Sequence, residues 1–117
     1  MRWKASFDRA VRTAPQVGPR VAVLSFDEPA QVHPLVATTW ERRLRPRPVL
    51  AANAGWLDGR VNFAVRGGPP ELDLRALLRE ALPEGAGHEL GHGHARATGG
   101  SLPPALFGLL LERLSAG

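Results

Sequence analysis

The sequence predicts one small α/β domain, with a mixed β-sheet, a central hairpin and flanking helices. The length of 117 residues suits a single domain that buries its own core. Segments with helical periodicity alternate with short β-branched segments. The pair Asp58-Gly59 separates two strand-like segments, as in a β-hairpin. We find no linker, internal repeat or low-complexity block, so residues 1–117 are expected to form one domain, with a helical extension at 1–18 and a core at 20–115.

The N-terminal part predicts a helix followed by a strand. Apolar side chains recur at spacings of four, four and three residues, which places them on one face of a helix. This stripe consists of Trp3, Phe7, Val11 and Ala14. Pro15 and the Gly18-Pro19 pair are expected to end the helix, because proline lacks a backbone donor. Residues 20–26 (RVAVLSF) are largely apolar and β-branched, which indicates a buried strand.

A second helix and a hairpin follow. Pro34 suits the first turn of a helix, which is expected to stop before Pro46. Its expected buried stripe is Leu35, Val36, Thr39, Trp40 and Leu44. Residues 49–57 and 60–66 flank Asp58-Gly59, a two-residue connection of the type I′ kind. In the second arm, one face is expected to pack on the core while the other meets solvent or a ligand. The core face carries Val61, Phe63 and Val65, and the opposite face carries Asn62, Ala64 and Arg66.

Two further helices are expected around a glycine-rich segment. Asp73 can cap the first of them, which ends at Pro83. Its expected buried stripe is Leu74, Leu77, Leu78 and Ala81. After the glycine-rich segment and a short strand, Ser101 followed by Pro103-Pro104 is expected to open the last helix. The expected buried stripe of this helix is Leu106, Leu109, Leu110 and Leu114.

The formal charge is +4 and comes almost entirely from arginine, because Lys4 is the only lysine. This charge permits an anionic partner without requiring one, and genome base composition or a hot habitat explains the arginine content equally well. Cysteine is absent, which excludes disulfides and thiolate metal sites and suits a reducing cytoplasm. With no long apolar run and no signal-peptide pattern, we expect a cytoplasmic protein that has no membrane partner.

The clearest functional candidate is the segment 85–100, which reads GAGHELGHGHARATGG. Glycine supplies positive φ and allows close backbone approach, and successive exposed N–H groups can hold an anion. His94 and Arg96 add side-chain donors, and the arginine fork suits phosphate. We interpret Gly91–Gly100 as a phosphate-binding loop. The alternative is a flexible loop whose histidines meet only solvent.

The same segment contains a zinc-protease pattern, His88-Glu89-Leu90-Gly91-His92, with His94 as a conceivable third ligand. Such a site needs a helix that places both histidines on one face. Each glycine costs about 1 kcal/mol relative to alanine inside a helix, and the window 87–93 contains three. We therefore expect no metal, and a zinc-dependent hydrolase is kept only as the alternative.

The glycine-rich segment resembles the DHH-associated domain, the C-terminal module of DHH-type phosphoesterases such as RecJ-like exonucleases and oligoribonucleases. That family carries a G-G-G-H-x-x-A-A-G signature, and a related module occurs in alanyl-tRNA synthetases. The matching positions here are Gly91, His92, Gly93, His94, Ala97, Thr98 and Gly99. His92 replaces the second glycine of the signature, and Thr98 replaces its second alanine. The strand 61–66 that ends in arginine and the helix 73–82 follow the family order, so the resemblance covers roughly residues 20–115.

This resemblance implies a domain that holds a short single-stranded nucleic acid or a nucleotide while a separate DHH domain hydrolyses it. The residues it places toward the substrate phosphate are Arg66, Gly91, Gly93, His94 and Gly99. Gly100 extends the same loop, and we add Arg96 and Asn62 for their side-chain donors. No Asp-His-His motif is present, so the chain is not expected to catalyse hydrolysis by itself or to hold a cofactor. A separately encoded DHH protein is an expected partner, and a homodimer formed through the N-terminal helix is the structural alternative.

Several remaining residues have two interpretations. Trp3 and Trp40 fall on apolar helical stripes and are expected to pack, whereas Trp56 beside the turn is equally suited to stacking on a base. The arginines at 42, 43, 45 and 47 are expected to form a solvated helix end, with a phosphate track as the alternative. His33 precedes Pro34 and is expected to be structural or exposed.

Overall fold

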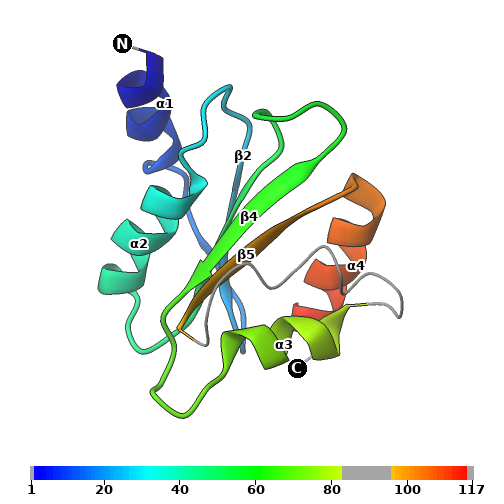
Figure 1. Cartoon of the computed structure of the whole chain (residues 1–117). Helices are drawn as coiled ribbons and strands as arrows, with labels where there is room; N and C mark the ends of the chain where they lie inside the picture. Colours follow the sequence, from blue (N-terminus) through cyan, green and yellow to red (C-terminus); the bar gives the residue numbers. More distant parts are fainter. Residues whose placement is uncertain (1, 83–95, 116–117) are drawn as a thin grey trace.

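One mixed sheet of five strands forms the centre of the molecule, in the spatial order β1-β2-β3-β4-β5 (Figure 1). The structure is a computed structural model that describes residues 2–82 and 96–115. The strands are β1 (Gln16–Val17), β2 (Ala22–Phe26), β3 (Val49–Asn53), β4 (Val61–Arg66) and β5 (Ala97–Leu102). Strands β2 and β3 are parallel, and the remaining neighbours are antiparallel. The predicted α/β class with a mixed sheet is therefore confirmed.

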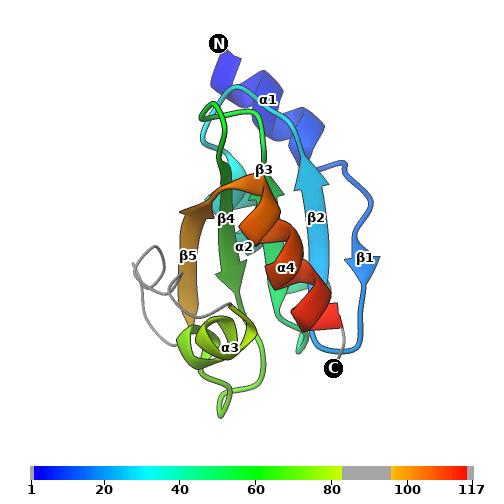
Figure 2. The same cartoon turned by 90° about the vertical axis from the view of Figure 1, so that its right-hand side faces the viewer.

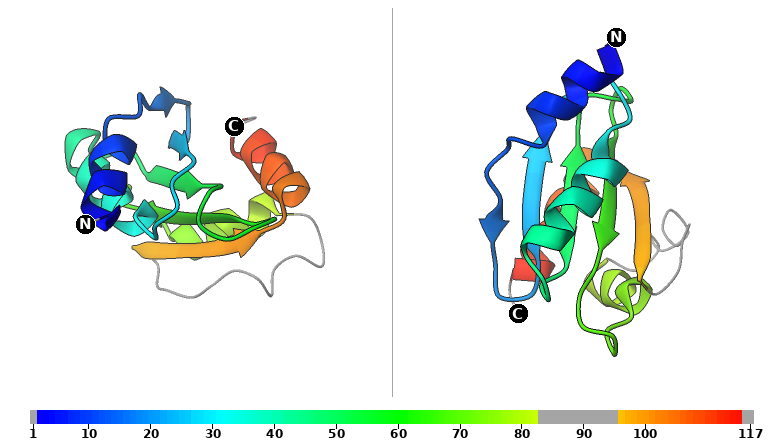
Figure 3. Two further views of the ribbon diagram at one scale, coloured as in Figure 1. Left: turned by 90° about the horizontal axis from the view of Figure 1, so that it is seen from above. Right: turned by 90° about the vertical axis from the view of Figure 1, so that its left-hand side faces the viewer.

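Helices cover both faces of this sheet. The described residues form α1 (Arg2–Ala10), α2 (His33–Arg43), α3 (Leu74–Ala81) and α4 (Pro104–Ser115). In Figure 2, α4 and α3 lie in front of the sheet and α2 lies behind it. The view from above in Figure 3 shows α1 beside α2, on the side of the sheet away from α4. The parallel pair β2–β3 needs a crossover, and α2 supplies it. Within the described part of the chain, no helix is long and apolar enough to cross a membrane.

The larger apolar core lies between the sheet and the pair α3–α4. The rings of Phe63 on β4 and Phe107 on α4 pack with their centroids 5.5 Å apart. From α3, the side chains of Leu74, Leu77, Leu78 and Ala81 all reach this core, as their spacing predicts. Asp73 caps that helix, since its Oδ1 accepts from the backbone N–H of Arg75 at 2.9 Å. The local signals of α3 are therefore confirmed in full.

A second core lies between the opposite face of the sheet and α2. Its buried members from α2 and the residue before it are Val32, Val36 and Ala37, and its members from the strands are Ala22, Leu24, Val49, Ala51 and Ala64. Trp3 and Trp40 pack against this core, which confirms their predicted role. The fork of Arg9 joins α1 to the buried Glu28 carboxylate, with Nη2 2.6 Å from Oε1. These contacts fix α1 and α2 on one side of the sheet.

The predicted two-residue type I′ turn at Asp58-Gly59 is wrong. The ladder ends at the pair Asn53–Asn62, so residues 54–60 form a longer connection. A type I′ turn needs positive φ at both central residues, and of the two only Gly59 has it, at 70°. The physical reason is distant in sequence. The Asn53 amide accepts from the N–H of Glu28 at 3.0 Å and donates to Ala30 O at 2.9 Å, which ties the end of β3 to the loop before α2.

Other boundaries and faces also differ from the prediction. Helix α1 ends at Ala10 rather than near Pro15, and the short edge strand β1 follows it unpredicted. On α2, Leu35 is 46% exposed, because the helix turns Val36 and Ala37 toward the sheet instead. On α4, Leu109 is 40% exposed and Phe107 takes its place in the core.

The C-terminal part of the predicted phosphate-binding loop is a strand. Gly99, Gly100 and Ser101 lie in β5, which pairs along β4 from Arg66–Ala97 to Val61–Leu102. Neither glycine has the positive φ expected for a loop. Gly99 instead permits close approach, since a Cβ atom there would lie 2.4 Å from the carbonyl oxygen of Phe63. The requirement for glycine at position 99 is therefore a cross-strand contact.

Candidate functional site

The sheet face under α2 carries a groove because the helix covers only part of it. In the right-hand view of Figure 3, α2 lies over the middle strands and β5 stays clear of it. Successive residues of a strand point to opposite faces, so Asn62, Ala64 and Arg66 all face α2 rather than α3 and α4. The groove encloses about 440 Å³. Its lining residues are Gln31, His33, Pro34, Trp56, Arg60, Asn62, Phe63, Ala64, Arg66, Ala97, Thr98, Gly99, Gly100 and Ser101.

Arg66 provides a half-buried cation in this groove. Its Nη1 donates to the carbonyl oxygens of Val65 at 3.1 Å and of Thr98 at 3.2 Å, across the β4–β5 pair. Burial lowers the pKa of Arg66, but a guanidinium stays charged in proteins. No carboxylate among residues 2–82 and 96–115 pairs with it. The groove therefore holds a partly desolvated positive charge.

His33 lies opposite, at the start of α2, and is only 6% exposed. Burial, and secondarily the charge of Arg66, lower the pKa of His33 from 6.5 to about 4. The imidazole is therefore neutral at pH 7. Its Nδ1 has no hydrogen-bond partner in the described part of the protein, and its ring lies 6.0 Å from that of Trp56. The expectation that His33 is structural or exposed did not anticipate a place in the groove.

Asn62 is a second buried polar group with unused hydrogen-bonding capacity. It lies on β4, opposite Ser101 on β5, and is 4% exposed. Its Nδ2 has no partner among the described residues. An unsatisfied buried donor lowers the stability of the fold by about 1–3 kcal/mol. A donor that stays unsatisfied on the wall of a ligand-sized hollow is therefore a candidate for hydrogen bonding to a ligand.

At the end of the groove away from Arg66, a side-chain contact joins the residue before β4 to β5. Arg60 donates from Nε to Ser101 Oγ at 3.1 Å and from Nη2 to Ser101 O at 2.6 Å. An arginine thus stands at each end of the groove, with Asn62 between them on the same face of the strand. The sequence analysis did not single out Arg60. Its spacing of six residues from Arg66 places both arginines on one face of an extended segment, and this signal could have identified it.

The contacts of Arg96 differ from those expected of a residue that binds a ligand. Its guanidinium donates to the carbonyl oxygens of Pro69 at 2.6 Å, Leu72 at 3.2 Å and Gly68. These bonds hold the turn between β4 and α3, where Gly67 and Gly68 both have positive φ. Arg96 and Arg66 both line a neighbouring hollow of about 450 Å³. Most of the Arg96 fork is therefore engaged by the backbone.

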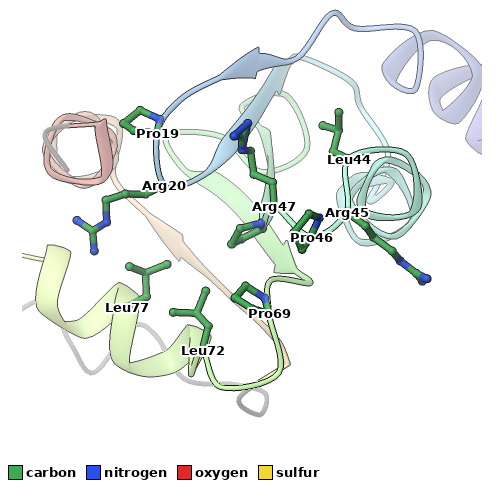
Figure 4. Close-up of a pocket in the computed structure, with 10 residues that line it drawn as sticks. Pro19, Arg20, Leu44, Arg45, Pro46, Arg47, Pro69, Leu72 and Leu77 are labelled. Carbon is green, nitrogen blue, oxygen red and sulfur yellow. The ribbon is translucent and has the colours of Figure 1, made fainter.

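A hollow of about 540 Å³ at the end of the sheet is larger than the groove, but its lining residues offer fewer unsatisfied polar groups (Figure 4). Its lining consists of Pro19, Arg20, Leu44, Arg45, Pro46, Arg47, Pro48, Pro69, Leu72 and Leu77. Arg45 points away from it in Figure 4 and pairs with Glu41 at 2.8 Å. None of the unpartnered buried polar atoms of the described chain belongs to these residues. We therefore place the candidate site in the smaller groove.

The predicted residues Gly91, Gly93 and His94 lie outside the described residues, as do His88 and His92 of the zinc pattern. Within residues 2–82 and 96–115, no three histidine, aspartate or glutamate side chains gather closely enough to hold a metal ion. The arginines at 42, 43 and 45 are exposed at the end of α2, and Arg43 stacks over Trp40 at 4.8 Å. Of the predicted site residues, the groove brings together Asn62, Arg66, Gly99 and Gly100.

Neither the family models nor the curated proteins gave a match to this chain. Several solved structures do match it. The C-Ala domain of Aquifex aeolicus alanyl-tRNA synthetase aligns with a TM-score of 0.61 and 16% identity, over 89% of this chain and 99% of that domain. RecJ from Thermus thermophilus, in complex with Mn²⁺, aligns with a TM-score of 0.63 and 24% identity, over 97% of this chain.

The chain has the fold of the DHH-associated domain. The pGpG-specific phosphodiesterase PggH from Vibrio cholerae shares it, with a TM-score of 0.53, 12% identity and 98% of this chain aligned. The chain spans only 16% of the RecJ chain and 38% of PggH, but nearly all of the C-Ala domain. The fold that the resemblance implies is therefore confirmed, and the groove lies on the β4–β5 face of that fold.

Proposed function

We propose that this domain binds the phosphate of a short single-stranded nucleic acid or a nucleotide in the groove, and that it does not hydrolyse that ligand by itself. The observation that carries the proposal is the Arg66 cation, half-buried and without a carboxylate partner in the described chain. Its hydrogen bonds to described residues use only Nη1, so within this part of the chain Nε and Nη2 keep donors for a ligand. A guanidinium that is already partly desolvated binds phosphate through strong charge-assisted hydrogen bonds.

The names of the structural neighbours support the same proposal. They include an alanyl-tRNA synthetase, an exonuclease and a pGpG-specific phosphodiesterase. In RecJ and PggH the matching domain is a small part of a longer chain. We therefore propose a separately encoded DHH phosphoesterase as the partner that supplies catalysis. The roles of Gly91, Gly93, His94 and Gly100 remain predictions, and Arg96 is proposed to support the site through the turn that it holds.

A salt titration tests this proposal. Binding of a labelled single-stranded oligonucleotide is followed by fluorescence anisotropy for the parent, Arg66→Ala and Arg79→Ala. Arg79 is exposed on α3, on the opposite side of the sheet, so its loss controls for net charge. We expect Arg66→Ala to weaken binding and to reduce the slope of log K against log salt by about 0.7, the value of one phosphate contact to a single strand.

The control variant is expected to keep the slope of the parent. Equal slopes and affinities for Arg66→Ala and Arg79→Ala would contradict the placement of phosphate at Arg66. A parent that binds no oligonucleotide at low salt would contradict the proposed function and favour a structural role in assembly. His94→Ala, measured alongside, tests the predicted contribution of the glycine-rich segment.

A further inference from the structure

The two ends of the groove differ in chemistry. Arg66 stands at one end, whereas the other end carries two rings, those of His33 and Trp56, beside Arg60, whose guanidinium is bonded to Ser101. The two rings have their centroids 6.0 Å apart and their planes tilted by 42°. Trp56 is half-exposed in the connection between β3 and β4. A half-exposed indole on the wall of a polar groove is available for stacking, and base–aromatic stacking accepts any base because every base has a π face.

The polar groups beside these rings match the edge of a base. An asparagine amide carries a donor and an acceptor side by side, and a neutral imidazole carries one of each. Asn62 Nδ2 and His33 Nδ1 are both without partners in the described chain, and both side chains are more than nine-tenths buried. The terminal amide torsion of asparagine is soft, so either amide atom can turn toward a ligand. Base edges offer donors and acceptors in this pattern.

We propose that the Trp56 end of the groove receives one unstacked nucleobase, which stacks on Trp56 and is hydrogen-bonded at its edge by Asn62 and His33 while Arg66 holds its phosphate. This inference rests on the proposed function and specifies the ligand as a nucleotide unit of a single strand or a free nucleotide. In a duplex a base must first be unpaired and unstacked, at a cost of a few kcal/mol, so a single strand or a free nucleotide is the favoured ligand.

The dimensions suit one nucleotide. Asn62 and Arg66 are four residues apart on β4, which corresponds to roughly 13 Å between Cα atoms, and the long Arg66 side chain can shorten the span that a ligand must bridge. The groove volume of about 440 Å³ lies within the range of about 300–1,000 Å³ that is usual for small-ligand sites. Asn62, which contacts the base in this proposal, and Arg66, which holds the phosphate, are therefore different residues of one strand face.

A matched pair of probes tests the base site. The first is a short single-stranded oligonucleotide, and the second has the same phosphates but lacks its bases. We expect the abasic probe to bind about tenfold more weakly to the parent, which corresponds to about 1.4 kcal/mol. Trp56→Ala is expected to remove most of that difference, and Trp56→Phe to retain much of it because a flat ring remains. Leu57→Ala, in the same connection and 41% exposed, is the matched control.

Competition then separates the two sources of the ligand. If a nucleoside monophosphate displaces the oligonucleotide while ribose 5-phosphate does not, a free nucleotide suffices. If only the oligonucleotide binds and it still outcompetes its abasic counterpart, the ligand is a nucleotide within a strand. Equal binding of the intact and abasic probes by the parent, with a salt slope that still depends on Arg66, overturns the base site and leaves phosphate binding intact. No binding of either probe overturns both.

Discussion

On one face of the sheet, α3 and α4 close over Phe63, Val65 and Leu102 and leave an apolar core. On the other face, α2 covers β3 and part of β4 but not β5, and the uncovered part holds Arg66, Asn62 and His33. Strand β4 serves both faces through the alternation of its side chains. One strand thus stabilises the fold with one set of residues and carries unsatisfied polar groups on its other face.

The largest expected contrast is in stability between neighbouring residues of β4. Phe63→Ala is expected to lower the free energy of unfolding by about 3–5 kcal/mol, because it removes a ring from the core between β4 and α4. Asn62→Leu, one residue away on the groove face, is expected to leave it unchanged or raise it by about 1 kcal/mol, because an unsatisfied amide is removed. Urea denaturation measures both. Similar losses for the two variants would contradict the division between the faces.

The next contrast is the dependence of stability on pH at His33. Its folded pKa of about 4 lies below the ordinary value of 6.5, so the unfolded chain binds more protons between these values. Stability should therefore be complete above pH 6.5 and fall as the pH decreases toward 4, by up to about 3 kcal/mol.

His33→Gln should remove this part of the pH dependence, and thermal unfolding of both proteins between pH 5 and pH 7 measures it (about 1.4 kcal/mol per pH unit at most). The Arg9 fork lowers the pKa of Glu28 below 4.5, so the Glu28 contribution is lost only at more acidic pH. Parallel pH curves for the parent and His33→Gln would show that the histidine is not held neutral by its surroundings.

The smallest expected contrast is in stability between alanine substitutions at two glycines. Gly99→Ala is expected to destabilise the protein by about 1–3 kcal/mol, because the new Cβ meets the backbone oxygen of Phe63. Gly108→Ala is expected to stabilise it by about 0.5–1 kcal/mol, because position 108 lies within α4 and a Cβ there meets nothing within 4 Å. Melting temperatures report both changes. A stable Gly99→Ala protein would mean that β4 and β5 do not approach this closely.

The parts of the fold that depend on local signals were predictable from the sequence. Helix α3 has both a capping aspartate and a regular stripe, and its cap and its buried residues agree with the prediction. The hairpin was mispredicted because the end of β3 is fixed by the Asn53 amide, whose partners Glu28 and Ala30 precede it by more than twenty residues. Strand β1 has only two residues and no pattern of its own.

The groove was only partly predictable for the same reason. Arg66 and Asn62 share a strand face that alternation reveals, and Gly99 belongs to the family signature. His33 reaches them only because the β2–α2–β3 crossover places the start of α2 over β4. No sequence pattern near His33 indicates that contact, and the use of the Arg96 fork by three backbone carbonyls is equally non-local.

Ligand binding in the groove can be tested by mapping backbone amide shifts during titration with a short single-stranded oligonucleotide at low salt. We predict saturable changes concentrated at residues 60–66 in and just before β4, at residues 97–101 of β5 and in the first turn of α2, all of which border the groove. Changes concentrated on α3 and α4, or around the hollow lined by Leu44, Leu72 and Leu77, would contradict it.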